Sequence, residues 1–312
     1  MNHNDDYGEH TMNHFSTEQR VLQIGEVHVG GRPGLEPTVL IGSIFYSKDK
    51  SVENDRTGTI NKSIVEDELY KLTNVSETTG LPSMLDVVAT TPEAMRNYLS
   101  YLADITDMPL LIDGSGSNEV NISGLEVARN LDILDRVVLN SIIPETGDST
   151  LEHVKELGLK NAILLAFDSE SMASASKRVD LANKLVERVK SVGIDNIMID
   201  TGVVDMLTLG LACKALGTIK ETLGYPVGCG AHNSVNTWAG LTQKFGKEAK
   251  RPALVGSSLM PVVLGADFVL YGPIKNAGIV FPSIAMIDTA LSGMLLEDGI
   301  RPDRNHPRFR IG

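Results

Sequence analysis

Five hydrogen-bonding side chains end or closely follow apolar runs of strand length. Asp86, Asp113 and Asp200 are carboxylates, and Asn140 and Asn233 are amides. A carboxylate accepts two hydrogen bonds from a ring N–H and a neighbouring exocyclic amine, and an amide donates and accepts without changing charge. These residue types suit a pocket that holds a polar heterocycle such as a pterin. For each aspartate alone, an N-cap or loop-bracing role explains the position as well, but it is a less satisfactory explanation for all three together.

The segment that leads into Asn233 is the most informative stretch. It is an extended, glycine-rich run from Tyr225 that ends with Asn233 at the start of an expected helix. The run imitates a dinucleotide-binding glycine loop, but Asn233 stands in the place of the third glycine and the run belongs to the seventh β/α unit rather than the first. Cys229 and His232 form a lone Cys-x-x-His without a third ligand, which favours a buried thiol beside a loop imidazole over a zinc site. We expect no metal ligand set in this chain.

Covalent catalysis is not indicated by any sequence motif. The chain has no Gly-x-Ser-x-Gly string and no phosphate-binding loop pattern. We therefore expect a site that binds and orients a polar ring, an effect of position rather than of a covalent enzyme intermediate.

These side chains need a scaffold that brings strand ends together, and the hydrophobic pattern predicts one. Eight apolar runs alternate with turns and helical periods, as in β/α units on a parallel sheet. We predict a (β/α)8 TIM barrel, in which catalytic side chains come from different strand ends, with a doubly wound sheet as the alternative. A short N-terminal hairpin at 21–29 is expected to cap one end. The predicted strands are 39–44, 83–88, 109–112, 136–140, 162–167, 196–199, 227–229 and 268–270, and the predicted helices are 62–78, 92–105, 123–131, 171–192, 207–222 and 284–296, with an extra helix at 252–264.

Composition narrows the classes of partner. The 312 residues include 28 Lys and Arg against 40 Asp and Glu, a formal net charge of −12. We predict an acidic surface without a basic cluster, and hence no nucleic-acid partner. The two cysteines provide no disulfide framework, and no signal sequence or membrane-spanning run is evident. We expect a polar extension at 1–19 and one pterin-binding domain at 20–312, in a cytoplasmic homodimer without membrane insertion.

Four strings in the chain resemble one protein family. They are PTVLIGSIFY from Pro37, DVVATTPEAM from Asp86, AILLAF from Ala162 and CGAHNS from Cys229. They closely resemble the H subunit of tetrahydromethanopterin S-methyltransferase and its bacterial relatives, the methylcorrinoid protein:tetrahydrofolate methyltransferases of glycine betaine and methylamine demethylation. The resemblance runs from about Val21 to the C-terminus.

The resemblance implies a methyltransferase that moves a methyl group between a methylcorrinoid (cobalamin) on a partner corrinoid protein and N5 of tetrahydrofolate. Two alternatives are the same chemistry with tetrahydromethanopterin, as a subunit of a methyltransferase complex, and a non-catalytic pterin-binding subunit. In related pterin-binding barrels the residue matching Asn233 bonds near N5, and carboxylates matching Asp86 and Asp200 hold the pyrimidine edge. We therefore predict Asn233 as the catalytic residue and, with Asp113 and Asn140, all five side chains as pterin ligands.

The chain departs from these relatives in two ways. Related methyltransferases often have Asp-Ser-Thr-Asn after the third strand, but this chain has Gly-Ser-Gly after Asp113, and Asn118 is the candidate to replace the missing amide. A dihydropteroate synthase-like condensing activity would need a Lys and Arg set for pyrophosphate, which the sequence pattern does not locate. Because no corrinoid domain is evident, the carrier protein is expected to dock on the rim, where the loops after Asp86, Asp113, Asp200 and Asn233 lie. Ala231 is expected to face the carrier there.

Overall fold

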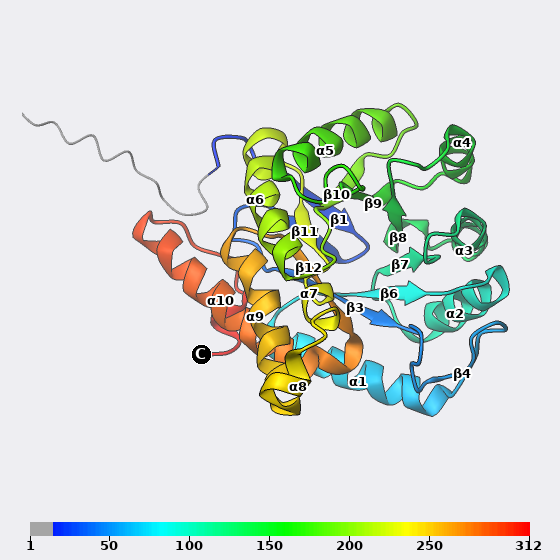
Figure 1. Ribbon diagram of the computed structural model, residues 1–312, viewed down its shortest axis with the longest axis horizontal. Coiled ribbons are helices and arrows are strands. Elements are labelled where there is room, and N and C mark those ends of the chain that lie inside the picture. Colours follow the sequence, from blue (N-terminus) through cyan, green and yellow to red (C-terminus); the bar gives the residue numbers. More distant parts are fainter. Residues whose placement is uncertain (1–14) are drawn as a thin grey trace, which may run out of the picture.

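The computed structural model describes residues 15–312, whose backbone forms a closed barrel of eight parallel strands surrounded by helices (Figure 1). The strands follow their order along the chain, and β12 pairs with β3 to close the ring. This is the predicted (β/α)8 barrel, and all eight predicted strands are present. Their bounds are β3 Val39–Ile44, β6 Ser83–Val88, β7 Leu110–Asp113, β8 Val137–Ile142, β9 Asn161–Leu165, β10 Asn196–Asp200, β11 Val227–Cys229 and β12 Phe268–Pro273.

The helices follow the predicted order with shifted ends. Helix α2 (Pro92–Ile105) has the predicted bounds, because Thr91 Oγ1 accepts a hydrogen bond from the backbone N–H of Ala94 and Pro92 opens the first turn. Helix α3 (Asn118–Asn130) begins before the predicted residue 123, because Ser117 caps it. Helix α4 (Asp148–Leu157) was not predicted, and no side chain caps its start. The remaining barrel helices are α1 Lys62–Thr79, α5 Ala175–Lys190, α6 Met206–Leu223 and α10 Ala277–Glu297.

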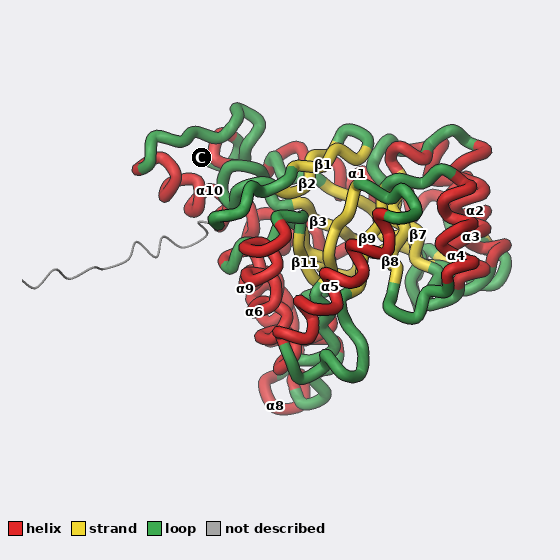
Figure 2. The backbone as a smooth tube through the Cα atoms, turned by 90° about the horizontal axis from the view of Figure 1, so that it is seen from above, coloured by secondary structure: helices red, strands yellow, loops and turns green. Residues whose placement is uncertain are grey.

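A two-stranded hairpin closes the amino-terminal end of the barrel, as predicted. Strands β1 (Val21–Ile24) and β2 (Val27–Gly30) pair antiparallel. Leu22, Ile24 and Val29 are buried against the inward-facing apolar residues of the barrel strands. Figure 2 shows this hairpin at one end and helix α8 at the opposite end. The opposite end of the barrel, where the carboxyl ends of the strands lie, is therefore the end at which a ligand can enter.

The residues before the hairpin contact the end of α6. Gln19 Nε2 donates a 3.0 Å hydrogen bond to the carbonyl of Lys220, and Ser16 N donates one of 3.2 Å to Glu221. Residues 1–14 of the predicted extension lie outside the described residues.

Two additions modify the barrel near its carboxyl end. A small hairpin of β4 (Val52–Asn54) and β5 (Thr59–Ile60) follows β3. Between β11 and β12 the chain forms α7, α8 and α9 in place of one helix, and α8 stands out from the rest of the fold in Figure 2. Helix α9 is the predicted extra helix. The bounds of the three are Asn233–Asn236, Leu241–Phe245 and Lys250–Val263.

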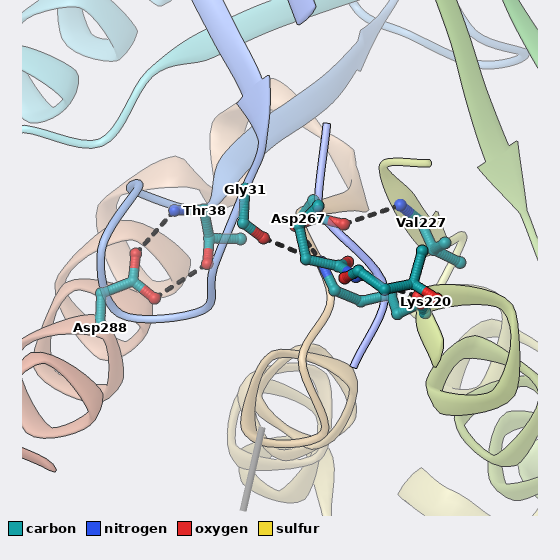
Figure 3. A network of polar contacts seen from close by, with 8 residues as sticks. Gly31, Thr38, Lys220, Val227, Asp267 and Asp288 are labelled. Atoms are coloured by element: carbon teal, nitrogen blue, oxygen red, sulfur yellow. Dashed lines mark hydrogen bonds and ion pairs between the residues drawn. The ribbon is translucent and has the colours of Figure 1, made fainter. Parts of the chain in front are cut away.

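A buried ion pair joins α6 to the eighth β/α unit (Figure 3). Lys220 Nζ lies 2.6 Å from Asp267 Oδ1 and donates a 3.1 Å hydrogen bond to the carbonyl of Gly31. The other oxygen of Asp267 accepts the backbone N–H of Val227 at 2.8 Å. Because every charged atom of the pair has a partner, burial of both groups is tolerated.

Helix α10 is the last and most apolar helix of the barrel. By length and composition alone, Ile274–Glu297 could cross a membrane. In the fold, α10 packs against α1 and α9, with Val280 and Phe281 fully buried. Its buried Asp288 accepts two hydrogen bonds from Thr38, of 2.7 Å from N and 2.8 Å from Oγ1 (Figure 3). The apolar composition thus serves a helix that covers the barrel.

Candidate functional site

One cavity at the carboxyl end of the barrel contains all five predicted site residues. Its volume is about 440 Å³. Parallel strands open at the same end, so side chains far apart in the sequence meet there. The structure brings the five together as the strand-end pattern predicted, while their roles in binding stay predictions. They are Asp86 on β6, Asp113 at the end of β7, Asn140 on β8, Asp200 at the end of β10 and Asn233 at the start of α7.

Asp86 lies within its strand rather than at its end, because two valines continue β6 beyond it. It is 4% exposed. Ser43 Oγ donates a 2.8 Å hydrogen bond to Oδ2, and Asn140 Nδ2 donates one of 2.9 Å to Oδ1. Burial raises the pKa of Asp86, and these two hydrogen bonds oppose the rise. The carboxylate is fixed in orientation and keeps a further lone pair on each oxygen for a ligand.

The two other carboxyl groups of the cavity also have raised pKa values. Burial, and then the charge of Asp86, raises the pKa of Asp113 to about 7, against a 2.7 Å hydrogen bond from the backbone N–H of Ser115. Burial raises the pKa of Asp200 to about 6, against a 2.7 Å hydrogen bond from the backbone N–H of Gly202. Within the described chain, no Lys or Arg lines this cavity. The charge of Arg178, behind the wall, also opposes the rise for Asp200. Carboxylates without a cation in the cavity favour a ligand that donates N–H groups.

Asn233 follows β11 after a short turn rather than ending the strand. It is the first residue of α7, as the sequence predicted. Its Nδ2 donates a 3.1 Å hydrogen bond to the carbonyl of Val203 in the loop after β10. This bond fixes the orientation of the amide, and Oδ1 and the second N–H of Nδ2 are left for a ligand. The amide needs no rotation to present its oxygen.

Two further residues of the cavity were not singled out from the sequence. Ser43, on β3, holds Asp86, and Tyr46 lines the wall just beyond that strand. Both lie in the family-like string that begins at Pro37. The available signal was Ser43 itself, since a hydroxyl in an otherwise apolar strand that is buried throughout needs a hydrogen-bond partner.

Arg178 was also missed, although it orders the loops that form one side of the cavity. Its guanidinium is 0% exposed and donates hydrogen bonds to backbone carbonyls of the loops after β9 and β10. The acceptors include Ser171 at 3.2 Å and Gly202 at 2.8 Å. Its sequence position, within a helical period, gave no indication of this role. The guanidinium ties the Asp200 loop to its neighbour.

Two expectations about the rim are wrong. Ala231 is 0% exposed, and its carbonyl accepts a 2.7 Å hydrogen bond from Ser234 Oγ, so its side chain cannot face a docking partner. Asn118 is exposed at the start of α3 and does not line the cavity, so it does not replace the missing amide. Asn121 Oδ1 instead accepts the backbone N–H of Gly114 at 2.8 Å and shapes the loop after Asp113.

Cys229 and His232 have separate surroundings. Burial raises the pKa of the Cys229 thiol well above its usual range. His232 Nδ1 lies 3.0 Å from the carbonyl of Leu270, and burial lowers the pKa of the imidazole. Among residues 15–312, no three His, Cys, Asp or Glu side chains are grouped so that they could hold a metal ion.

Sequence comparison identifies relatives along nearly the whole chain. The model of the family described as tetrahydromethanopterin S-methyltransferase MtrH subunit matches residues 17–303. The chain is 35% identical over 307 residues to the H subunit of tetrahydromethanopterin S-methyltransferase from Methanothermobacter thermautotrophicus, covering 95% of this chain and 99% of that protein. It is 34% identical to the same subunit from Methanocaldococcus jannaschii, covering 94% and 98%. The H subunit of a putative mtx methyltransferase from Methanosarcina barkeri is 32% identical, covering 94% and 97%.

Solved structures share the fold at low sequence identity. Dihydropteroate synthase from Xanthomonas albilineans, in complex with 7,8-dihydropteroate, superimposes with a TM-score of 0.59 at 15% identity, covering 86% of this chain and 98% of that one. The enzyme from Thermus thermophilus gives a TM-score of 0.57 at 17% identity, covering 87% and 99%. These likenesses establish the barrel fold.

Proposed function

The chain belongs to the tetrahydromethanopterin S-methyltransferase MtrH subunit family of methyltransferases, and we propose that it moves a methyl group between a corrinoid carried by a separate protein and N5 of a reduced pterin. The pterin would occupy the cavity lined by Asp86, Asp113, Asn140, Asp200 and Asn233. The five residues named from the sequence are the ligands in this proposal.

The observation that carries the proposal is the gathering of three carboxyl groups, two of them buried and Asp113 partly buried, in a cavity that no cation lines. The pyrimidine edge of a pterin offers a ring N–H and an exocyclic amine, which a carboxylate accepts as a parallel pair. Asp86 and Asp200, both at most 9% exposed, are the candidates for that edge. The N–H donors of such a ligand would stabilise the carboxylates in a cavity that no cationic side chain lines.

In the direction toward the pterin, the N5 lone pair attacks the methyl carbon. The new N5–C bond forms as the Co–C bond breaks, the electron pair stays on cobalt as cob(I)alamin, and N5 then releases its proton to solvent. In reverse, N5 must first gain a proton to become a leaving group. Asn233 Oδ1 would accept a hydrogen bond from that protonated nitrogen, because Nδ2 is held by Val203. The protein's contribution is orientation and charge stabilisation, not a covalent intermediate.

The pterin is proposed to be tetrahydrofolate or tetrahydromethanopterin, which share the same head. The names of the relatives favour tetrahydromethanopterin, and binding titrations with both compounds would decide between them. The proposed setting is cytoplasmic, with a transient complex with a corrinoid protein and a homodimer of this chain. Sedimentation analysis of the isolated protein tests the homodimer.

Turnover by the isolated protein tests the catalytic proposal. The protein is mixed with free methylcobalamin and each pterin, and the cob(I)alamin spectrum is followed. Appearance of cob(I)alamin with equimolar methylpterin is the expected result. Pterin binding without any turnover would instead favour the non-catalytic pterin-binding subunit.

A further inference from the structure

We propose that a second cavity, adjoining the first, binds the anionic tail of the pterin substrate. It has a volume of about 510 Å³ and lies between α9 and the segment after β12. This inference rests on the proposed function, because it concerns the remainder of the same ligand. We refer to it as the basic cavity, defined by Lys247, Lys250, Arg251 and Lys275.

The charge of the basic cavity is opposite to that of the whole chain. Four cationic side chains line it, and in the described part of the chain no Asp or Glu does so. The chain as a whole has 40 acidic against 28 basic residues. The expectation of a surface without a basic cluster is therefore wrong. The basic cavity was missed because its four cations are separated in the sequence. Three lie in the short polar segment 247–251, and the fourth, Lys275, follows β12.

These cations have few anionic partners in the fold. Lys247, Lys250 and Arg251 make no ion pair within 4.0 Å among the described residues. Glu248 neighbours them in sequence but does not line the cavity. Lys275 Nζ donates a 2.7 Å hydrogen bond to Tyr46 Oη and lies within the electrostatic influence of Asp49 and Glu68. All four side chains are exposed, so their combined positive charge is available to an anion from solvent.

The basic cavity adjoins the cavity that contains Asp86 and Asp200. Ser43, Tyr46 and His232 line both. A ligand whose head lies against Asp86 and Asp200 can therefore extend past Tyr46 toward Lys275 without leaving the protein surface.

The two cavities together match a ligand with two different ends. The head of a reduced pterin offers N–H donors, which suit carboxylates, whereas its tail ends in carboxylates and, in tetrahydromethanopterin, also carries a phosphodiester. Carboxylate and phosphate oxygens both accept charge-assisted hydrogen bonds from Lys and Arg. The shared chemistry is an oxyanion, and a series of tails distinguishes which one is bound.

The test compares ligands that share the head and differ in the tail. Binding is measured for 6-methyltetrahydropterin, which has no tail, for tetrahydrofolate with one glutamate and with three, and for tetrahydromethanopterin. The variant is K250M/R251M, which removes two charges from the exposed first turn of α9. The matched control is K184M/K214M, which removes two charges from exposed faces of α5 and α6.

We expect K250M/R251M to weaken binding of the tailed pterins by about five- to thirtyfold, most for the most highly charged tail, and to leave the tail-free pterin unaffected. Added salt should weaken only the tailed ligands, because it screens the cations. The control should match the wild type for every ligand. A preference for the phosphodiester tail over the triglutamate tail would identify phosphate as the recognised group.

Three results would overturn the tail site. They are equal weakening of tailed and tail-free pterins, unchanged binding of both, or a defect confined to methyl transfer from a corrinoid protein. Failure of the wild type to bind the tail-free pterin is a distinct result, because it would contradict the pterin site itself.

Discussion

Asn140 Nδ2 donates a 2.9 Å hydrogen bond to Asp86 Oδ1, so an amide on β8 orients a carboxylate on β6. Asn140→Ala removes this donor and leaves that oxygen of a buried carboxylate without its partner. We expect the free energy of unfolding to fall by about 1–3 kcal/mol and the Kd for the pterin to rise about tenfold. Urea denaturation and equilibrium titration measure both. Asn74→Ala, on an exposed part of α1, serves as control, and unchanged affinity in Asn140→Ala would refute the orienting role.

Ionised Asp113 should lower the stability of the folded protein and strengthen pterin binding. Its pKa is about 7 in the fold against 3.8 for an unperturbed Asp. Folding therefore favours the protonated form, so the contribution of Asp113 to stability is fully present below pH 3.8 and is lost as pH rises from there through 7. Asp113→Asn keeps an oxygen for the Ser115 N–H but no charge.

We expect Asp113→Asn to be more stable than the wild type by about 1–2 kcal/mol at pH 8, with the difference vanishing toward pH 4. The same variant should bind the pterin more weakly at pH 8. Unfolding curves at several pH values give the first result and titrations the second. Equal stability of both proteins at pH 8 would mean that Asp113 ionises in the fold without cost.

Asn233→Ala should lower turnover far more than pterin affinity. The amide oxygen is the free acceptor beside the proposed position of N5, and its contribution grows only when N5 carries a proton. We expect kcat for methyl transfer from the pterin to fall about a hundredfold, whereas the Kd for the pterin should change by less than about threefold. Equal losses in kcat and affinity would make Asn233 a binding residue only.

The hydrophobic pattern predicted the barrel because each strand is a buried apolar run and each helix has its own period. The same pattern located Asp113 and Asp200, which end their strands after buried residues, and it brought Asp86 to the site although two valines continue that strand. It did not predict Arg178 or the basic cavity. Those depend on the segments after β9, β10, β11 and β12, whose meeting in space follows from barrel closure and not from local sequence. The buried state of Ala231 likewise depends on the turn before α7.

Arg178 should be a positioning residue for the Asp200 side of the cavity. Arg178→Met keeps much of the buried volume but leaves the carbonyls of Thr201 and Gly202 without their shared donor. We expect a loss of about 3 kcal/mol or more in the free energy of unfolding, together with weaker pterin binding in the protein that remains folded. Hydrogen exchange of the loops after β9 and β10 should increase. Increased exchange spread evenly over the barrel would argue for a general stability effect instead.

A substitution on the rim tests where the proposed carrier protein docks. Leu207 is the position chosen for it, because Ala231 is buried. Leu207 is 83% exposed on the first turn of α6, beside Met206, which is 50% exposed, and Phe245 on α8 is 62% exposed. Large exposed apolar side chains at the carboxyl end of the barrel suit a protein contact. In the proposed reaction the corrinoid approaches this end, because the hairpin of β1 and β2 closes the other.

Leu207→Arg should slow methyl transfer from a corrinoid protein about tenfold while leaving transfer from free methylcobalamin and pterin affinity unchanged. The reason is that a charge at the contact opposes docking but lies outside the pterin cavity. Ile105→Arg is the matched control, because Ile105 is 39% exposed at the end of α2, on the opposite side of the barrel. Helices run antiparallel to the strands in this fold, so that position faces away from the site. If both variants behave alike with the carrier protein, the carrier does not dock at the α6 rim.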